Sequence, residues 1–81
     1  MPYYLYILYS AKIDRYYVGS TSNLSDRLHR HNTGRSKYTK RGIPWEVVYT
    51  ESFPDRPAAV RREREIKKKK SRVYVEGLLK R

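Results

Sequence analysis

Three short segments rich in aromatic and β-branched residues, each bounded by polar turn residues, predict three β-strands. They comprise residues 3–10, 16–20 and 45–53. Leu5 and Ile7 share one face of the first strand, because successive side chains of a strand point to opposite faces. The short polar link between the first two strands predicts an antiparallel hairpin.

Apolar residues at helical spacing predict a helix between the second and third strands. It begins after a capping residue, Ser22 or Asn23, carries an apolar stripe that ends at His31, and stops at Gly34. Residues 36–44 have no apolar period and contain glycine and proline. We expect them to form a basic surface loop with at most a short helical turn.

Two further helices are predicted after the third strand. Asp55 is the expected cap of the first, and Pro57 suits its first turn, where the missing N–H is not needed. This helix continues through Ile66 into the lysine run Lys67–Lys70. Ser71 is the expected cap of a last short helix. The apolar side of that last helix consists of Val75, Leu78 and Leu79.

The predicted order of elements is therefore β-β-α-β-α-α. A three-stranded sheet cannot bury its own faces, so the helices must cover at least one of them. We expect a small α/β fold, a three-stranded antiparallel sheet flanked by helices. The 81 residues contain neither an internal repeat nor a linker, so residues 1–81 are expected to form a single domain.

The charge of the chain indicates the kind of partner. Nineteen Lys and Arg residues stand against eight Asp and Glu residues, a net charge of +11. A polyanion is the natural partner, with nucleic acid favoured over an acidic membrane surface. The chain has no cysteine, no apolar stretch near the roughly 20 residues of a membrane span, and no basic leader. We therefore expect a cytoplasmic protein without a membrane partner.

Clustered cations in two segments are the candidate phosphate contacts. One cluster lies in the predicted loop after the first helix, and the other lies at the end of the second helix. A run of lysines is often only a solvated face, but the overall charge favours contact with phosphate. The candidates are Arg35, Lys37, Lys40, Arg41, Lys67, Lys68, Lys69 and Lys70.

Two charged residues occupy positions that should face inward. Arg27 lies beside the apolar stripe of the first helix, and Glu63 lies on the inward side of the second. Buried charges are costly unless they are paired or bound to a metal, so such positions often mark functional sites. The structural alternative is an ion pair between these two residues. Structural roles are equally open to His31 as a half-buried histidine and to tyrosines as packing residues.

The order and spacing of several short motifs resemble the GIY-YIG nuclease superfamily. The motifs are Tyr4-Leu5-Tyr6, Tyr17-Val18-Gly19, Arg27, His31-Asn32 and Glu63. The closest likeness is to the small stand-alone members from bacteria and archaea, also called URI-domain proteins. One departure is that Tyr4 stands where the first motif has its glycine. The family fold is a three-stranded antiparallel sheet flanked by helices, in agreement with the fold predicted above.

The resemblance implies hydrolysis of DNA phosphodiesters with one divalent metal, Mg²⁺ or Mn²⁺. By position, Glu63 would be the sole protein ligand of the metal, and Arg27 would stabilise charge on the phosphoryl oxygens. Tyr6 would be the general base, Tyr17 would hydrogen-bond the attacking water or help to orient Tyr6, and His31 would support the site or contact phosphate. Because a free phenol has a pKa near 10, we expect surrounding cations to lower the pKa of Tyr6.

The expected partner is DNA, duplex or branched, and RNA is the alternative. We expect no separate recognition module within these 81 residues, so specificity would come from a protein partner or from the shape of the nucleic acid. The resemblance also implies a setting in DNA repair or recombination. The rival function is a catalytically inactive nucleic-acid-binding module. Glu63 favours an enzyme, because a carboxylate among phosphate-binding cations would repel a ligand that is only bound. The oligomeric state is left open.

Overall fold

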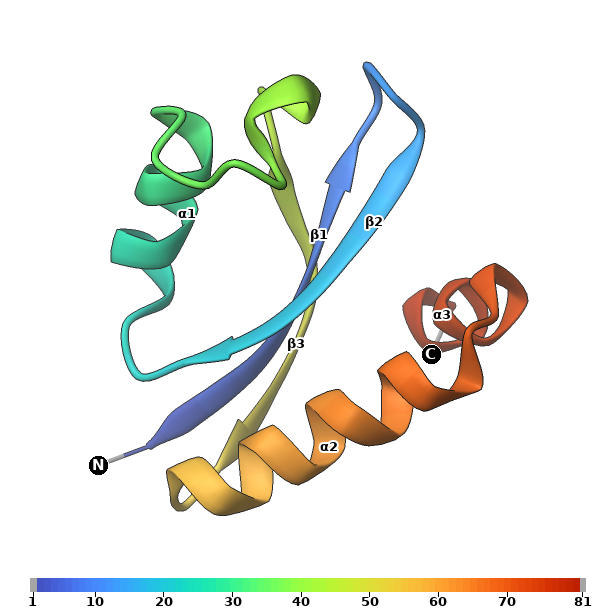
Figure 1. Ribbon diagram of the computed structural model, residues 1–81. Helices are drawn as coiled ribbons and strands as arrows, with labels where there is room; N and C mark the ends of the chain where they lie inside the picture. The colour runs from blue at the N-terminus through green and yellow to red at the C-terminus, as the bar shows by residue number, and fades with distance from the viewer. Residues whose placement is uncertain (1, 81) are drawn as a thin grey trace.

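An antiparallel sheet with the strand order β2-β1-β3 lies at the centre of the molecule (Figure 1). The computed structural model describes residues 2–80. The strands are β1, Tyr3–Ser10, β2, Arg15–Thr21, and β3, Glu46–Phe53. The observed order β-β-α-β-α-α confirms the fold class predicted from the sequence.

Three α-helices and one short 3₁₀ turn complete the fold. They are α1, Leu24–Asn32, η1, Lys40–Gly42, α2, Arg56–Lys69, and α3, Arg72–Leu79. The sheet lies between α1 on one side and α2 with α3 on the other (Figure 1). No helix within residues 2–80 is long and apolar enough to cross a membrane.

Side-chain caps explain where the helices begin. The carboxamide oxygen of Asn23 accepts a hydrogen bond from the Asp26 N–H at 3.0 Å, which settles the choice between Ser22 and Asn23. The Asp55 carboxylate and the Ser71 hydroxyl cap α2 and α3 in the same way, as predicted. The caps satisfy N–H groups that the first turn leaves without a helical partner.

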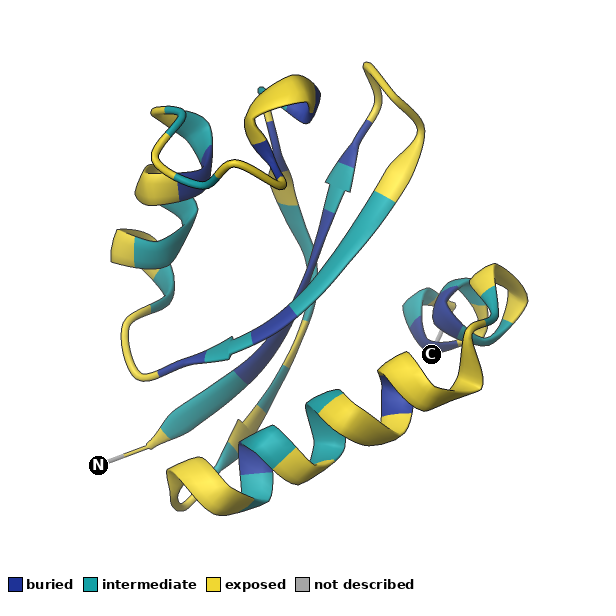
Figure 2. Ribbon diagram, in the orientation of Figure 1, coloured by how far each residue is buried: buried dark blue, intermediate teal, exposed yellow. Residues whose placement is uncertain are grey.

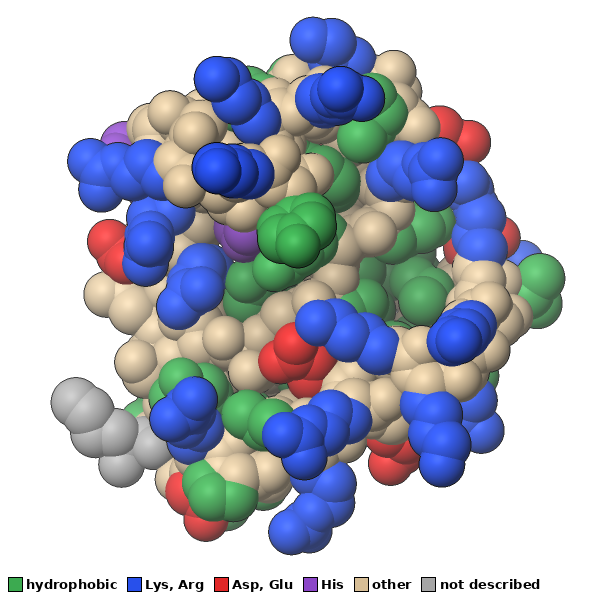
Figure 3. All heavy atoms as spheres, in the orientation of Figure 1, with side chains coloured by type: hydrophobic (Ala, Val, Ile, Leu, Met, Phe, Trp, Pro, Cys, Tyr) green, Lys and Arg blue, Asp and Glu red, His purple; other side chains and the backbone are tan. Residues whose placement is uncertain are grey.

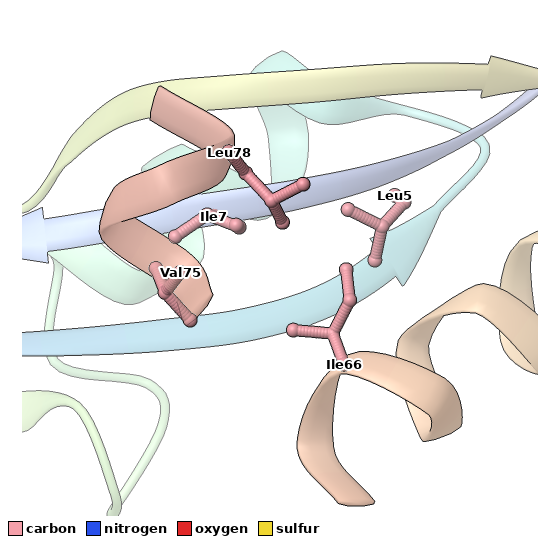
Figure 4. Packing of buried hydrophobic residues seen from close by; sticks show 5 residues of the cluster. All are labelled: Leu5, Ile7, Ile66, Val75 and Leu78. Atoms are coloured by element: carbon pink, nitrogen blue, oxygen red, sulfur yellow. The ribbon is translucent and has the colours of Figure 1, made fainter. Parts of the chain in front are cut away.

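The sheet is buried on both faces, so alternate residues of β1 point into two separate cores (Figure 2). Leu5 and Ile7 pack with Ile66, Val75 and Leu78 beneath α2 and α3 (Figure 4). The residues of β1 that point to the opposite face pack toward α1 in a second cluster. Burial of each such side chain contributes about 1.5–3 kcal/mol. The members of the second cluster are Tyr6, Leu8 and Trp45.

The third strand begins one residue later than the sequence predicts. The backbone N–H of Trp45 donates to the Asn32 carboxamide oxygen at 2.6 Å, and the Asn32 carboxamide NH₂ donates to the Trp45 carbonyl at 2.9 Å. The side chain of Asn32 thus takes the place of a neighbouring strand for this one residue. It also fixes the end of α1 against the start of β3.

Candidate active site

A chain of hydrogen bonds connects the centre of the sheet with α1 and the segment that follows it. The Tyr6 hydroxyl, on β1, lies 3.2 Å from Nε2 of His31, on α1. Nδ1 of the same imidazole lies 2.7 Å from the Thr39 hydroxyl. All three residues are buried, and both ring nitrogens of His31 are therefore engaged. This chain holds the imidazole in one orientation.

Tyr17 lies beside these hydrogen bonds on β2, the edge strand next to β1. Its ring meets that of His31 edge to face, with 4.9 Å between centroids, and lies 6.4 Å from the ring of Tyr6. Unlike Tyr6, Tyr17 is only half-buried. Within residues 2–80 its hydroxyl has no hydrogen-bond partner, so it is available to water or to a substrate.

Glu63 brings a carboxylate from α2 to the same edge of the sheet. One oxygen accepts a hydrogen bond from the Ser20 hydroxyl at 2.7 Å, and the other accepts one from the Lys67 ammonium at 2.6 Å. The ammonium also lies 5.9 Å from the centre of the Tyr17 ring. The carboxylate is thus tied to the tyrosine side of the site through Lys67.

Arg27 and His31 project from one face of α1 and help to line a pocket of about 190 Å³. Two further arginines, a serine and Tyr17 complete it, and no carboxylate lines it. Within residues 2–80 Arg27 forms no ion pair, and the structural alternative of a pair with Glu63 is wrong. The residues that line the pocket are Tyr17, Arg27, Arg30, His31, Arg35 and Ser36.

The expectation that cations lower the pKa of Tyr6 is wrong. Its side chain is 2% exposed, and burial raises the pKa of this phenol well above its usual range. Tyr17 and Glu63 raise that pKa further, whereas Arg27 lowers it by less than burial raises it. Tyr6 is therefore a protonated phenol at neutral pH.

Burial has the opposite effect on the imidazole. The pKa of His31 is lowered, mainly because the buried ring loses water that would stabilise its cation, and further because Arg27 and Arg30 are close. At neutral pH His31 is uncharged and bonds to the two hydroxyl groups through one protonated and one unprotonated nitrogen.

The predicted phosphate contacts all lie at the surface, as Figure 3 shows for the Lys and Arg side chains on one face. Arg35, Lys37, Lys40 and Arg41 belong to the segment between α1 and β3, and the lysine run 67–70 covers the end of α2. Each of these residues is exposed. Their contact with nucleic acid stays a prediction.

The sequence analysis missed three residues of the site, Ser20, Asn32 as a structural link, and Thr39. Each acts through a partner distant in the sequence, such as Glu63 for Ser20 or Trp45 for Asn32. Thr39 lies in the segment taken for a surface loop, yet it is buried because it bonds to His31. A local signal existed for Ser20, which directly follows the second motif, and for Asn32, which belongs to the motif His31-Asn32, but not for Thr39.

Comparisons with known proteins give a consistent picture. A family model described as the GIY-YIG catalytic domain matches residues 2–76. A UPF0213 protein of Natronomonas pharaonis is 41% identical over 80% of this chain and 76% of its own. One of Staphylococcus haemolyticus is 42% identical, covering 80% and 79%. The solution NMR structure of a UPF0213 protein of Bacillus halodurans matches with a TM-score of 0.60 and 36% identity, covering 99% of this chain and 84% of that one.

Proposed function

Because the chain belongs to the GIY-YIG catalytic-domain family, we propose that it is a metal-dependent endonuclease that hydrolyses phosphodiester bonds of DNA. The observation that supports this most is the convergence of four elements at the edge formed by β2. They bring together two tyrosines, an arginine, a histidine and one carboxylate, namely Tyr6, Tyr17, Arg27, His31 and Glu63.

The residues at this edge fit a hard divalent cation, Mg²⁺ or Mn²⁺. Glu63 offers carboxylate oxygens at a side chain that is 20% exposed, and Lys67 is exposed enough to swing away from it. Within residues 2–80 no group of three or more His, Cys, Asp or Glu could hold a metal. Glu63 would therefore be the protein ligand, with water and substrate phosphate as the other ligands.

Such a cation, when bound, would polarise the phosphate and neutralise the leaving oxygen. The chain's own residues would supply the remaining functions. The Arg27 guanidinium forms no ion pair with a carboxylate of the described residues 2–80, so it can stabilise charge that develops on the phosphoryl oxygens. The Tyr17 hydroxyl, half-exposed at the pocket, can hold the attacking water.

Tyr6 takes a different role from that expected for a general base. A buried phenol with a raised pKa is a poor proton acceptor at neutral pH, but it holds His31 in place through Nε2. We therefore assign Tyr6 to positioning and assign Tyr17 to contact with the water. Comparing pH–rate profiles of Tyr6→Phe and Tyr17→Phe tests this. If only Tyr6→Phe lost the rise of rate with pH, the assignment would be contradicted.

The test of the function is cleavage of supercoiled plasmid and of branched DNA with Mg²⁺, with Mn²⁺ and with a chelator. Glu63→Gln should abolish metal-dependent cleavage while the fold is kept. Glu46→Gln, at an exposed glutamate on β3, is the matched control and should cleave normally. Preference for branched DNA would support a role in repair or recombination.

Two outcomes would count against the proposal. Cleavage that survives in Glu63→Gln would show that another protein causes it. DNA binding without cleavage under either metal would instead support the inactive binding module.

A further inference from the structure

The segment between α1 and β3 carries the one tyrosine of the chain that is exposed. The Tyr38 side chain is 92% exposed, whereas the other eight tyrosines are buried or half-buried. An aromatic ring in water gains nothing from that position. Its burial against a ligand would be favourable.

The exposed ring is held by a fixed backbone. Thr39, the next residue, is 1% exposed and bonds to His31, and its carbonyl accepts a hydrogen bond from the indole N–H of Trp45 at 2.6 Å. Ser36 closes the turn by accepting backbone hydrogen bonds from Thr39 at 3.3 Å and Lys40 at 3.1 Å. The backbone of Tyr38 is therefore fixed directly before Thr39, the residue that bonds to His31.

The charge around Tyr38 is of one sign. Between Asp26 and Glu46 the sequence contains no acidic residue. Within residues 2–80, none of the basic side chains in this interval forms an ion pair with an acidic residue. Their positive charge attracts anions from outside the protein. The cations are Arg27, Arg30, Arg35, Lys37, Lys40 and Arg41.

The pocket that Arg27, Arg30 and Arg35 line, the arginine pocket, provides a place for that anion, and its lining reaches Ser36, two residues before Tyr38 in the sequence. Its volume of about 190 Å³ is below the range of drug-sized ligand sites and suits a small group such as phosphate. Arginine forms paired hydrogen bonds with phosphate, and no carboxylate of the pocket competes for them.

We propose that residues 35–41 bind an unpaired nucleotide of single-stranded DNA, with its base on the ring of Tyr38 and a backbone phosphate in the arginine pocket. The choice of DNA rests on the proposed function, whereas the unpaired state rests on the ring. A base within a duplex is already stacked on both faces, so an exposed tyrosine can stack only on a base that is free. The enzyme would then select a bubble, flap or branch.

Fluorescence anisotropy with a labelled single strand and with its duplex, both in chelator, tests the stacking. Tyr38→Ala should weaken single-strand binding by on the order of tenfold and leave duplex binding nearly unchanged. Tyr38→Phe, which keeps the ring, should bind normally. The matched control is Val73→Ala, at an apolar residue of α3 that is 79% exposed, and it should change neither affinity.

The pocket is tested separately by the salt dependence of single-strand binding. Arg30→Ala and Arg35→Ala should each lower the slope of log affinity against log salt by about 0.7. Lys80→Ala, an exposed lysine at the end of α3, should leave the slope unchanged.

Three results would overturn the proposal. If Tyr38→Ala weakened binding of single strand and duplex equally, the proposed stacking would be refuted. If the salt slopes of both arginine variants were unchanged, the proposed phosphate site would be refuted. A dependence on Tyr38 only with RNA of the same sequence would overturn the assignment to DNA. Because these measurements exclude metal, a failure of the proposed cleavage would leave them unaffected.

Discussion

At the residue scale, Gly19 determines where Tyr6 can lie. The two residues face each other across β1 and β2, and a Cβ on Gly19 would lie 2.5 Å from the Tyr6 hydroxyl oxygen. The absence of a side chain at Gly19 thus makes room for the ring that reaches His31. The glycine of the second motif has a steric function here, and no left-handed backbone conformation is involved.

Gly19→Ala should therefore displace the Tyr6 ring and break its hydrogen bond to His31. We expect a loss of about 1–3 kcal/mol in the free energy of unfolding, measured in urea, together with a loss of activity. The control is Gly77→Ala on α3, where a Cβ would meet nothing within 4 Å. That variant should gain up to about 1 kcal/mol, because alanine favours a helix.

His31 should make stability depend on pH. Its pKa in the folded state lies below the ordinary 6.5, because the ring is buried and because Arg27 and Arg30 are close to it. As pH falls below 6.5, the unfolded chain takes up a proton that the folded chain resists, so the free energy of unfolding decreases. Urea midpoints at pH 7.5 and pH 5 measure this.

Two variants separate this effect from other titrations. His31→Gln should flatten the pH dependence, whereas His29→Gln, at an exposed histidine of the same helix, should keep it. An unchanged slope in His31→Gln would refute the assignment.

At the element scale, polar contacts supplement a small apolar face in holding α1 to the molecule. His31 is its one buried residue, and Leu24 and Leu28 are only half-buried. The links at its C-terminal end are the bonds of His31 and the paired bonds between Asn32 and Trp45. A helix held in this way opens at lower free energy than the sheet does.

Asn32→Ala should loosen this helix. It removes two hydrogen bonds, each with a net contribution of about 0.5–1.5 kcal/mol, so we expect a loss of about 1–3 kcal/mol in urea unfolding. Hydrogen exchange should speed up in α1 while the amides of β1 stay protected. His29→Ala, at an exposed position of α1, should neither lower stability nor speed up exchange.

At the scale of the whole molecule, eight of the 19 basic residues lie in two regions. One is the segment after α1, and the other is the end of α2 with its lysine run. Lys67 of the second region contacts the carboxylate of Glu63, so the field that attracts DNA also leads the strand to the proposed metal ligand.

Duplex binding should therefore fall steeply with salt, and both regions should contribute. Replacing Lys68 and Lys69 together by alanine should lower the slope of log affinity against log salt by about 2, one phosphate contact for each lysine. Fluorescence anisotropy of labelled duplex DNA with the protein, in chelator and at several salt concentrations, measures the slope. Lys80→Ala should leave it unchanged, and an equal change there would make the effect one of net charge alone.

Most of the fold could be predicted from the sequence because its signals are local. Asp55 and Ser71 cap helices within three residues of their own position, and the strands show their composition directly. The site could be predicted only in part. Thr39 acquires its role from a contact with His31 that the sequence does not encode locally. The pKa of Tyr6 was predicted in the wrong direction, because counting cations leaves out burial.

The contact between Lys67 and Glu63 has a consequence for how ligands act on each other. The ammonium of Lys67 already balances the charge of the Glu63 carboxylate. An incoming divalent cation must therefore displace this ammonium. A DNA phosphate offers the displaced ammonium a new partner. Bound DNA should therefore raise the affinity for the cation, and by thermodynamic linkage the cation should raise the affinity for DNA by the same factor. The enzyme would be assembled by its substrate and stay unloaded in the absence of DNA.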